Sequence, residues 1–231
     1  MWAGQLALAD DGWRVIAPQL RGFDGGDANP AATSIDDYAG DVVDLLDALH
    51  IEDAVFGGLS MGGYVAFALY RHAPRYFRGL ILADTRSQAD TPEGVAGRNR
   101  MLQLVEEKGP PGVADEMLPK LLGETTRRTR PDVVERVRAL ALSSPARAIA
   151  GALRALMTRP DSTPLLQTMH MPALVIVGAE DTLTPLSAAQ ELHRGIAGSE
   201  LVEIPAAGHL TNLEQPELFQ AALARFLSHR V

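Results

Sequence analysis

The chain has 231 residues, of which 46% are hydrophobic and 22% charged, and its net charge of −8 argues against a nucleic-acid partner, which needs clustered Lys and Arg. It contains no cysteine, which excludes disulfides and thiolate metal sites. No apolar run approaches the roughly 18 residues of a membrane span, and no signal peptide is recognisable. We therefore expect a soluble, cytoplasmic protein with no membrane partner.

Short apolar or β-branched runs alternate with longer helical patterns along most of the chain. Most of these runs are apolar at consecutive positions, as expected of strands that helices cover on both faces. The predicted strands cover residues 14–17, 54–57, 80–83, 174–177 and 201–204. The predicted helices between them cover residues 41–50, 64–72, 187–194 and 217–227. This alternation predicts an α/β fold with a mostly parallel sheet.

The stretch from residue 86 to 166 breaks the alternation, because it carries no convincing strand. Its helical pieces are predicted around residues 102–107, 113–122, 133–142 and 146–157. A helical insertion between two parallel strands would lie above the carboxyl edge of the sheet, where α/β folds bind ligands. We therefore expect a core of residues 1–85 and 167–231 and a helical cap of residues 86–166; a simple extra packing layer is the alternative.

A candidate nucleophile lies in Gly58-Leu59-Ser60-Met61-Gly62, which matches G-x-S-x-G. The pattern alone is weak, but here it follows a predicted strand and precedes a predicted helix, where a sharp turn exposes the serine hydroxyl. Gly58 and Gly62 are expected to avoid a collision across the turn, and Gly63 to let the helix approach the strand. The alternative is a glycine-rich structural turn. We predict Ser60 as nucleophile.

The backbone N–H of Met61 is a candidate oxyanion donor. It stands at the start of the predicted helix, where unpaired N–H groups and the helix dipole favour negative charge. Attack by Ser60 on a carbonyl would create an oxyanion at this point.

A serine hydroxyl needs a base, and histidine is the side chain whose ordinary pKa suits that task. His209 directly follows a glycine, just past the end of the last predicted strand and thus on the same edge as Ser60. The other histidines are placed near helix ends, before a strand, within a helix and in the tail: His50, His72, His170, His193 and His229. We predict His209 as the general base.

The base must be held in one tautomer by a carboxylate, and Asp181 follows the strand predicted at 174–177. Asp181 could instead cap the next helix, and Glu180 is adjacent. Asp84 is a rival, because it ends a neighbouring predicted strand on the same edge. We predict Asp181, in the chain order Ser, Asp, His of α/β-hydrolases.

Several motifs now add up to a family resemblance over nearly the whole length. The motifs are Val15-Ile16-Ala17-Pro18-Gln19-Leu20-Arg21-Gly22-Phe23, Gly58 to Gly63, Gly178-Ala179-Glu180-Asp181, Ala207-Gly208-His209 and Asn212 to Phe219. The chain resembles the α/β-hydrolase superfamily, and within it the serine esterase and 3-oxoadipate enol-lactonase-like branch. A serine at the turn distinguishes it from haloalkane dehalogenases and epoxide hydrolases, which use an aspartate there.

One departure from the resemblance concerns the N-terminus. Relatives begin with additional strands, one of which ends in a His-Gly pair whose loop donates the second oxyanion N–H. This sequence opens after that strand, so we expect an incomplete N-terminus that lacks strands of the family fold; the alternatives are a rearranged sheet or recruitment of another chain.

The expected reaction is hydrolysis of a small-molecule ester or lactone, and the resemblance implies no metal or organic cofactor. The rivals are a non-catalytic ligand-binding or inactive truncated protein, and a C–C bond hydrolase or perhydrolase with the same three residues. Residues 86–165 hold 13 Lys and Arg against 10 Asp and Glu. That excess could attract an anionic substrate, or the arginines could simply solvate helix faces.

Overall fold

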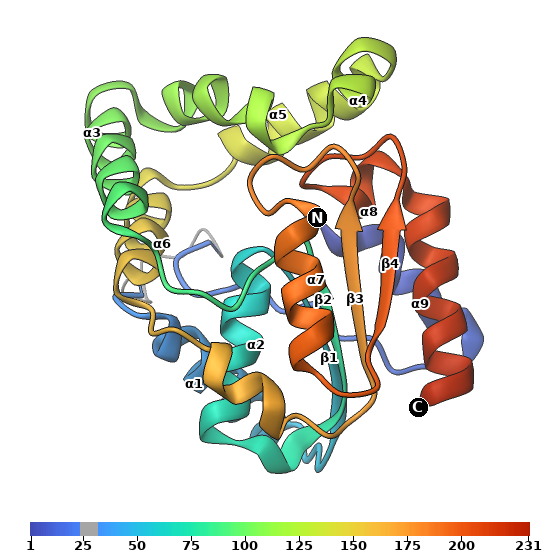
Figure 1. Ribbon diagram of the computed structural model, residues 1–231. Coiled ribbons are helices and arrows are strands. Elements are labelled where there is room, and N and C mark those ends of the chain that lie inside the picture. The colour runs from blue at the N-terminus through green and yellow to red at the C-terminus, as the bar shows by residue number, and fades with distance from the viewer. Residues whose placement is uncertain (24–31) are drawn as a thin grey trace.

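The computed structural model describes residues 1–23 and 32–231, and within them a sheet of four parallel strands forms the centre (Figure 1). The strands are β1 (Ala54–Leu59), β2 (Phe77–Ala83), β3 (Ala173–Gly178) and β4 (Glu200–Ile204). They pair in chain order, so their carboxyl ends share one edge of the sheet. This confirms the predicted α/β fold and four of the five predicted strands.

Helices cover both faces of the sheet, which explains the continuous apolar runs. Leu80 and Val175 pack with α2 (Met61–His72) and α7 (Leu186–Gly195). The next residue on each strand packs on the opposite face, against α9 (Pro216–Arg230) and η1 (Trp2–Asp11). Two further helices complete the core: α1 (Ile35–Ala48), which lies against α2, and the short α8 (Thr211–Glu214) before α9.

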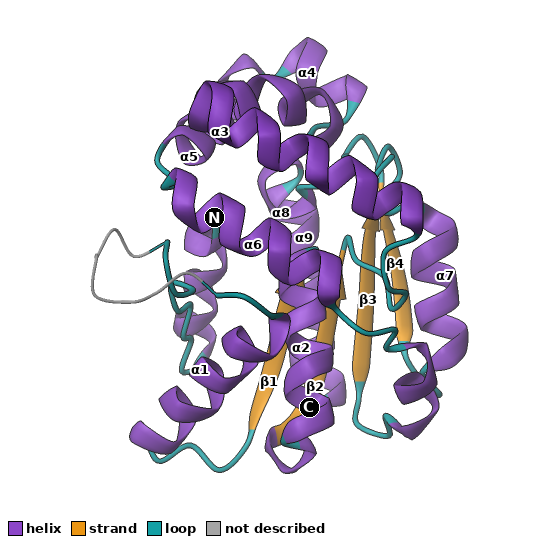
Figure 2. Ribbon diagram, turned by 90° about the vertical axis from the view of Figure 1, so that its left-hand side faces the viewer, coloured by secondary structure: helices purple, strands orange, loops and turns teal. Residues whose placement is uncertain are grey.

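The segment between β2 and β3 is helical, as predicted. It forms α3 (Pro92–Leu121), α4 (Glu124–Thr129), α5 (Pro131–Leu142) and α6 (Ala146–Thr158), followed by the short η3 (Thr163–Thr168). The two pieces predicted at 102–107 and 113–122 belong to α3, which is kinked at Gly109 (φ 61°). Figure 1 shows α4 and α5 beyond the carboxyl ends of the strands, and Figure 2 shows α6 alongside α3.

The prediction of a strand at residues 14–17 is wrong. A strand needs a partner for its backbone N–H and C=O groups. In the part of the chain that the structure describes, β1 pairs only with β2, and no strand lies beside its other edge. Residues 14–17 therefore lie outside the sheet and form neither helix nor strand, and Ile16 is 41% exposed.

The N-terminal 3₁₀ helix η1 was not predicted. It ends at Gly12, whose left-handed backbone (φ 88°) stops the helix, and Trp2 packs on Phe219 of α9 with ring centroids 6.2 Å apart. Among the described helices, none is both long enough and apolar enough to cross a bilayer; α3 reaches 30 residues but carries many charges.

Candidate active site

Ser60 occupies a strained turn between β1 and α2. Its backbone has φ 51° and ψ −112°, a region that residues with side chains rarely adopt. The Ser60 N–H donates to the carbonyl of Ala83 (2.9 Å), and the Ser60 carbonyl accepts from the Gly63 N–H (2.9 Å) and the Thr85 hydroxyl (2.8 Å). These bonds from the neighbouring strand and helix hold the turn in the geometry expected for G-x-S-x-G.

The glycines around Ser60 differ in whether a side chain would fit at their positions. A Cβ at Gly58 would lie 2.2 Å from the backbone of Gly62, and one at Gly63 would lie 2.5 Å from the Thr85 hydroxyl. The predicted needs for small residues at 58 and 63 are therefore confirmed. The prediction for Gly62 is wrong, because a Cβ there would meet nothing within 4 Å. The backbone of Gly62 is what a side chain at position 58 would strike, whereas a Cβ at position 62 itself would point into open space.

Met61 is the first residue of α2, with Ser60 at the N-cap. The first N–H groups of a helix lack partners within the helix, so this N–H is placed where an oxyanion donor is expected. No described residue is assigned as the second oxyanion donor.

His209 and Asp181 form a buried pair at the carboxyl edge of the sheet. His209 is 3% exposed, and its Nδ1 lies 2.8 Å from Oδ2 of Asp181. Burial raises the pKa of Asp181, but the hydrogen bonds from His209 and Thr184 outweigh it and hold that pKa below its ordinary value. The carboxylate therefore favours the tautomer with its proton on Nδ1, which leaves Nε2 free to accept a proton.

Thr184 is a member of this site that the sequence did not reveal. Its hydroxyl donates to Oδ2 of Asp181 (2.6 Å) and lies 3.2 Å from Nδ1 of His209. Oδ1 of Asp181 accepts from the N–H groups of Leu183 (2.8 Å) and Thr184 (3.1 Å). An aspartate side chain that binds the backbone two and three residues later is a common turn, and this pattern at Asp181 is the sequence signal that could have pointed to Thr184. The N-cap of α7 is Pro185, so Asp181 does not cap that helix.

Asp84, the rival acid, is fully buried but does not hydrogen-bond the imidazole. It accepts from the Gly178 N–H (2.9 Å) and the Thr211 hydroxyl (2.5 Å). Burial, opposed by nearby His209 and reinforced by the charge of Asp181, raises the pKa of Asp84 to about 7. Asp84 thus ties the ends of β2 and β3 to the loop that carries His209.

Glu180, the other alternative, points elsewhere. Its carboxylate accepts from the backbone N–H (2.9 Å) and the hydroxyl (2.5 Å) of Thr125, in α4. Of the three carboxylates considered from sequence, Asp181 is the one in contact with the imidazole.

The strand register places Ser60 at the same edge as this pair. Leu59 is level with Ala83, Ala83 with Ile176, and Ile176 with Val202, so the turns after β1, β3 and β4 open on one rim. No residue that the structure describes forms a hydrogen bond with the Ser60 hydroxyl. The structure therefore brings two of the three predicted side chains into contact, and the approach of Ser60 to His209 stays a prediction.

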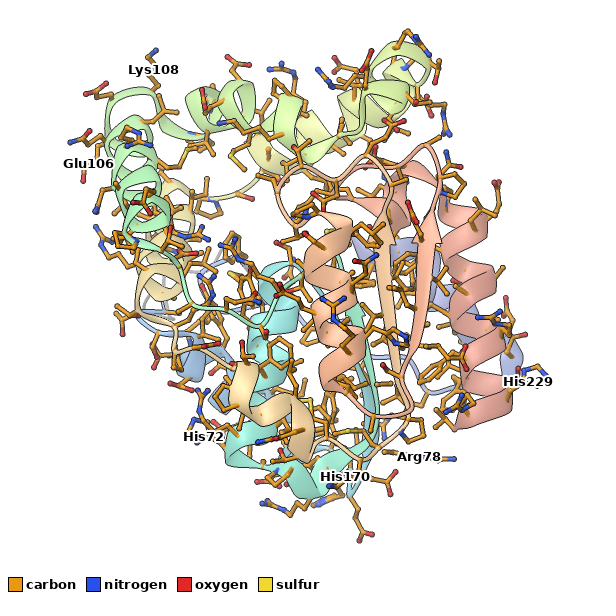
Figure 3. All side chains as sticks on the ribbon, viewed as in Figure 1. His72, Arg78, Glu106, Lys108, His170 and His229 are labelled. Carbon is orange, nitrogen blue, oxygen red and sulfur yellow. The ribbon has the colours of Figure 1, made fainter. Side chains whose placement is uncertain are left out.

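The other histidines lie away from this edge or have other partners. Figure 3 shows His72, His170 and His229 on the outside of the molecule, and all three are exposed. His229 belongs to the last turn of α9 and not to a frayed tail. His193 hydrogen-bonds the Ser199 hydroxyl (2.9 Å). Within residues 1–23 and 32–231, no cluster of three or more His, Asp or Glu has the arrangement of a metal site.

Comparisons with known proteins agree with the fold. A family model for the alpha/beta hydrolase fold matches residues 1–216. The chain is 32% identical to 3-oxoadipate enol-lactonase 2 of Acinetobacter baylyi, over 96% of this chain and 82% of that one. Among solved structures, a thermophilic esterase from Thermogutta terrifontis with malate bound is 40% identical with a TM-score of 0.93, over 98% and 84% of the two chains. The enol-lactonase of Burkholderia xenovorans LB400 is 29% identical with a TM-score of 0.89, over 99% and 86%. The resemblance drawn from the motifs is confirmed, and the chain belongs to the α/β-hydrolase fold family.

Proposed function

We propose that the protein is a serine hydrolase that cleaves a small carboxylic ester or lactone through an acyl-enzyme. The observation that carries this proposal is the buried His209–Asp181 hydrogen bond, which lies on the same sheet edge as the strained turn of Ser60. A carboxylate, an imidazole and an alcohol in this order form the arrangement that activates a serine. The relatives named as esterase and enol-lactonase support the choice of substrate class.

In the first half-reaction, Nε2 of His209 takes the proton of the Ser60 hydroxyl as its oxygen attacks the carbonyl carbon. Asp181 stabilises the imidazolium that results. The oxyanion faces the Met61 N–H at the start of α2; losing one such donor typically raises a barrier by about 3 to 4 kcal/mol. The tetrahedral intermediate then expels the alcohol, which receives the proton from His209.

In the second half-reaction, His209 removes a proton from water, which attacks the acyl-enzyme. The carbon–oxygen bond to Ser60 breaks, and the proton held by His209 returns to the serine oxygen. A lactone follows the same course, with the alcohol staying attached to the released acid.

The helices between β2 and β3 support a role as a cap. Within this segment, α4 and α5 lie beyond the carboxyl ends of the strands, while α3 and α6 pack against each other beside the core (Figure 1). Ligands of α/β folds bind at this edge. We propose that these helices cover the substrate and exclude water from the acyl-enzyme.

A fluorophosphonate probe tests the nucleophile. We expect the wild-type protein to be labelled at Ser60, and Ser60→Ala to lose both labelling and turnover of p-nitrophenyl acetate. Ser87→Ala is the matched control, since it removes a buried hydroxyl after β2 that bonds Thr163 (2.9 Å), and it should keep both activities. Labelling that survives in Ser60→Ala contradicts the proposal.

A substrate panel tests the reaction class. It contains neutral esters, lactones and their carboxylated counterparts at several salt concentrations, because attraction of an anionic substrate weakens as salt rises. Absence of labelling together with no turnover of any panel member would indicate a non-catalytic protein.

A further inference from the structure

We propose that Glu214 is a positioning residue whose buried carboxylate joins the loop that carries His209 to the α3–α4 junction, so that the helical insertion sets the position of the imidazole. This inference rests on the role proposed above for His209. It assigns a task to a buried acid that the proposed chemistry does not use.

The two oxygens of Glu214 accept three backbone N–H groups. Oε1 accepts from Gly208 (2.9 Å) and Leu210 (3.1 Å), the two neighbours of His209 in the chain. Oε2 accepts from Gly123 (2.8 Å), at the junction between α3 and α4. Glu214 is 0% exposed, so water does not compete for these bonds.

The backbone of His209 itself is bound to the insertion. Its N–H donates to the carbonyl of Leu121, the last residue of α3 (3.1 Å). Three consecutive N–H groups, at 208, 209 and 210, are thus committed either to the insertion or to the carboxylate that binds it. The core strands hold none of the three.

The two backbones are also in direct contact. A Cβ on Gly208 would lie 2.3 Å from the nitrogen of Gly123, and a Cβ on Gly123 would lie 2.9 Å from the nitrogen of Gly208. With no side chain between them, the loop cannot shift without the junction. The position of His209 relative to Asp181 therefore depends on the contact with residues 121–123.

The substitution Glu214→Gln separates this role from simple filling of space. Glutamine has nearly the same shape, but it offers one acceptor oxygen and one NH₂ group. The NH₂ must face either Gly123 or the pair Gly208 and Leu210, where two donors then oppose each other. One side of the connection is lost while the volume is kept.

Steady-state kinetics and proton NMR are the two measurements. A displacement of about 1 Å at a reacting group can cost about 100-fold, so we expect Glu214→Gln to lower kcat by up to about 100-fold with KM changed less than about threefold. The downfield proton resonance of His209 Nδ1–H, shared with Asp181, should shift or broaden. Glu214→Asp keeps both acceptor oxygens, so it should recover part of kcat; it also replaces Glu214→Gln if that variant does not fold.

The matched control is Asp90→Asn. Asp90 is a buried carboxylate inside the insertion, where it binds Arg86 (2.9 Å) and Arg159 (2.8 Å), and none of the described bonds joins it to residues 208–210. We expect its Tm to fall, with kcat within about threefold of wild type and the His209 resonance unchanged.

Two outcomes would overturn the proposal. One is that Glu214→Gln lowers Tm but leaves kcat and the resonance as in wild type. The other is that Asp90→Asn changes kcat and the resonance as much as Glu214→Gln does. If the wild-type protein hydrolyses no panel substrate, the proposed function fails, and the resonance alone decides whether Glu214 positions His209.

Discussion

Replacement of Asp181 by Asn should reverse the tautomer of His209. Oδ1 of Asp181 accepts two backbone N–H groups, from Leu183 (2.8 Å) and Thr184 (3.1 Å). The amide oxygen of Asn must take this place, because an NH₂ group there would face two donors. The NH₂ then occupies the place of Oδ2, 2.8 Å from Nδ1 of His209.

An NH₂ group can only donate to Nδ1, so the imidazole proton moves to Nε2. The nitrogen that should accept the Ser60 proton is then already protonated. Reversal of this kind in a serine hydrolase lowers kcat by about 10⁴. At about 1.36 kcal/mol for each factor of ten, the barrier rises by roughly 5 kcal/mol.

The assay is kcat for p-nitrophenyl acetate at neutral pH, with Asp84→Asn as the control. Asp84 is equally buried but bonds Gly178 and Thr211 rather than the imidazole, so its variant should keep kcat within about tenfold. If Asp181→Asn keeps kcat within tenfold, or if Asp84→Asn is the more damaged enzyme, the assignment of the acid is refuted.

Three further predictions concern stability. Gly63→Ala should lower the free energy of unfolding, measured in urea, by about 1–3 kcal/mol, because the added Cβ overpacks against Thr85. Gly62→Ala has open space at its Cβ and should be neutral or stabilising by up to about 1 kcal/mol. Equal losses of stability in the two variants would contradict the geometry. Asp90→Asn should lower the free energy of unfolding by about 3–5 kcal/mol, because it leaves buried arginine charge unpaired. Hydrogen bonds from Arg98 and Arg159 outweigh burial and lower the pKa of Asp90, so the stability that its carboxylate contributes is present above about pH 4 and is lost as the pH falls. The melting curves of the variant and the wild type should therefore converge in acid. Asp84, whose pKa is raised to about 7, should give the opposite pH dependence of stability, because the folded state holds a proton that the unfolded chain releases near pH 4. Its contribution to the free energy of unfolding is complete below pH 4 and falls by at most about 1.4 kcal/mol per pH unit towards pH 7. This slope should be absent in Asp84→Asn.

The strands of the sheet were predictable because burial on both faces leaves a local mark. Leu80 to Leu82 and Leu174 to Val177 are apolar at every position, and in the structure successive residues pack against opposite helical layers. Residues 14–17 carry a similar run, apolar from Val15 to Ala17, but form no strand. Strand formation depends on a neighbour with free N–H and C=O groups, and no short window of sequence contains that information.

The candidate site was predictable to the level of the strand ends and no further. Asp84 and Asp181 both follow strands on the same edge, so sequence alone could not decide between them. The choice depends on local backbone: Asp84 has a positive φ of 45°, and its side chain bonds Gly178 and Thr211 instead of the imidazole. Such a conformation is set by the packing around it, as is the hydroxyl of Thr184 that completes the site.

The contacts between the helical insertion and the core could not be predicted from the sequence either. The absence of strand patterns predicted helices above the sheet, which treats the insertion as a separate cover. The structure instead joins it to the loops that carry the candidate residues: Thr125 binds the carboxylate of Glu180, next to Asp181, and Leu121 accepts the N–H of His209. Because these bonds link residues far apart in the chain, they leave no periodic mark in the sequence. A movement of the insertion away from the sheet would have to break these bonds or carry His209 along. Under the proposed function, access of substrate and alignment of the base would therefore be linked.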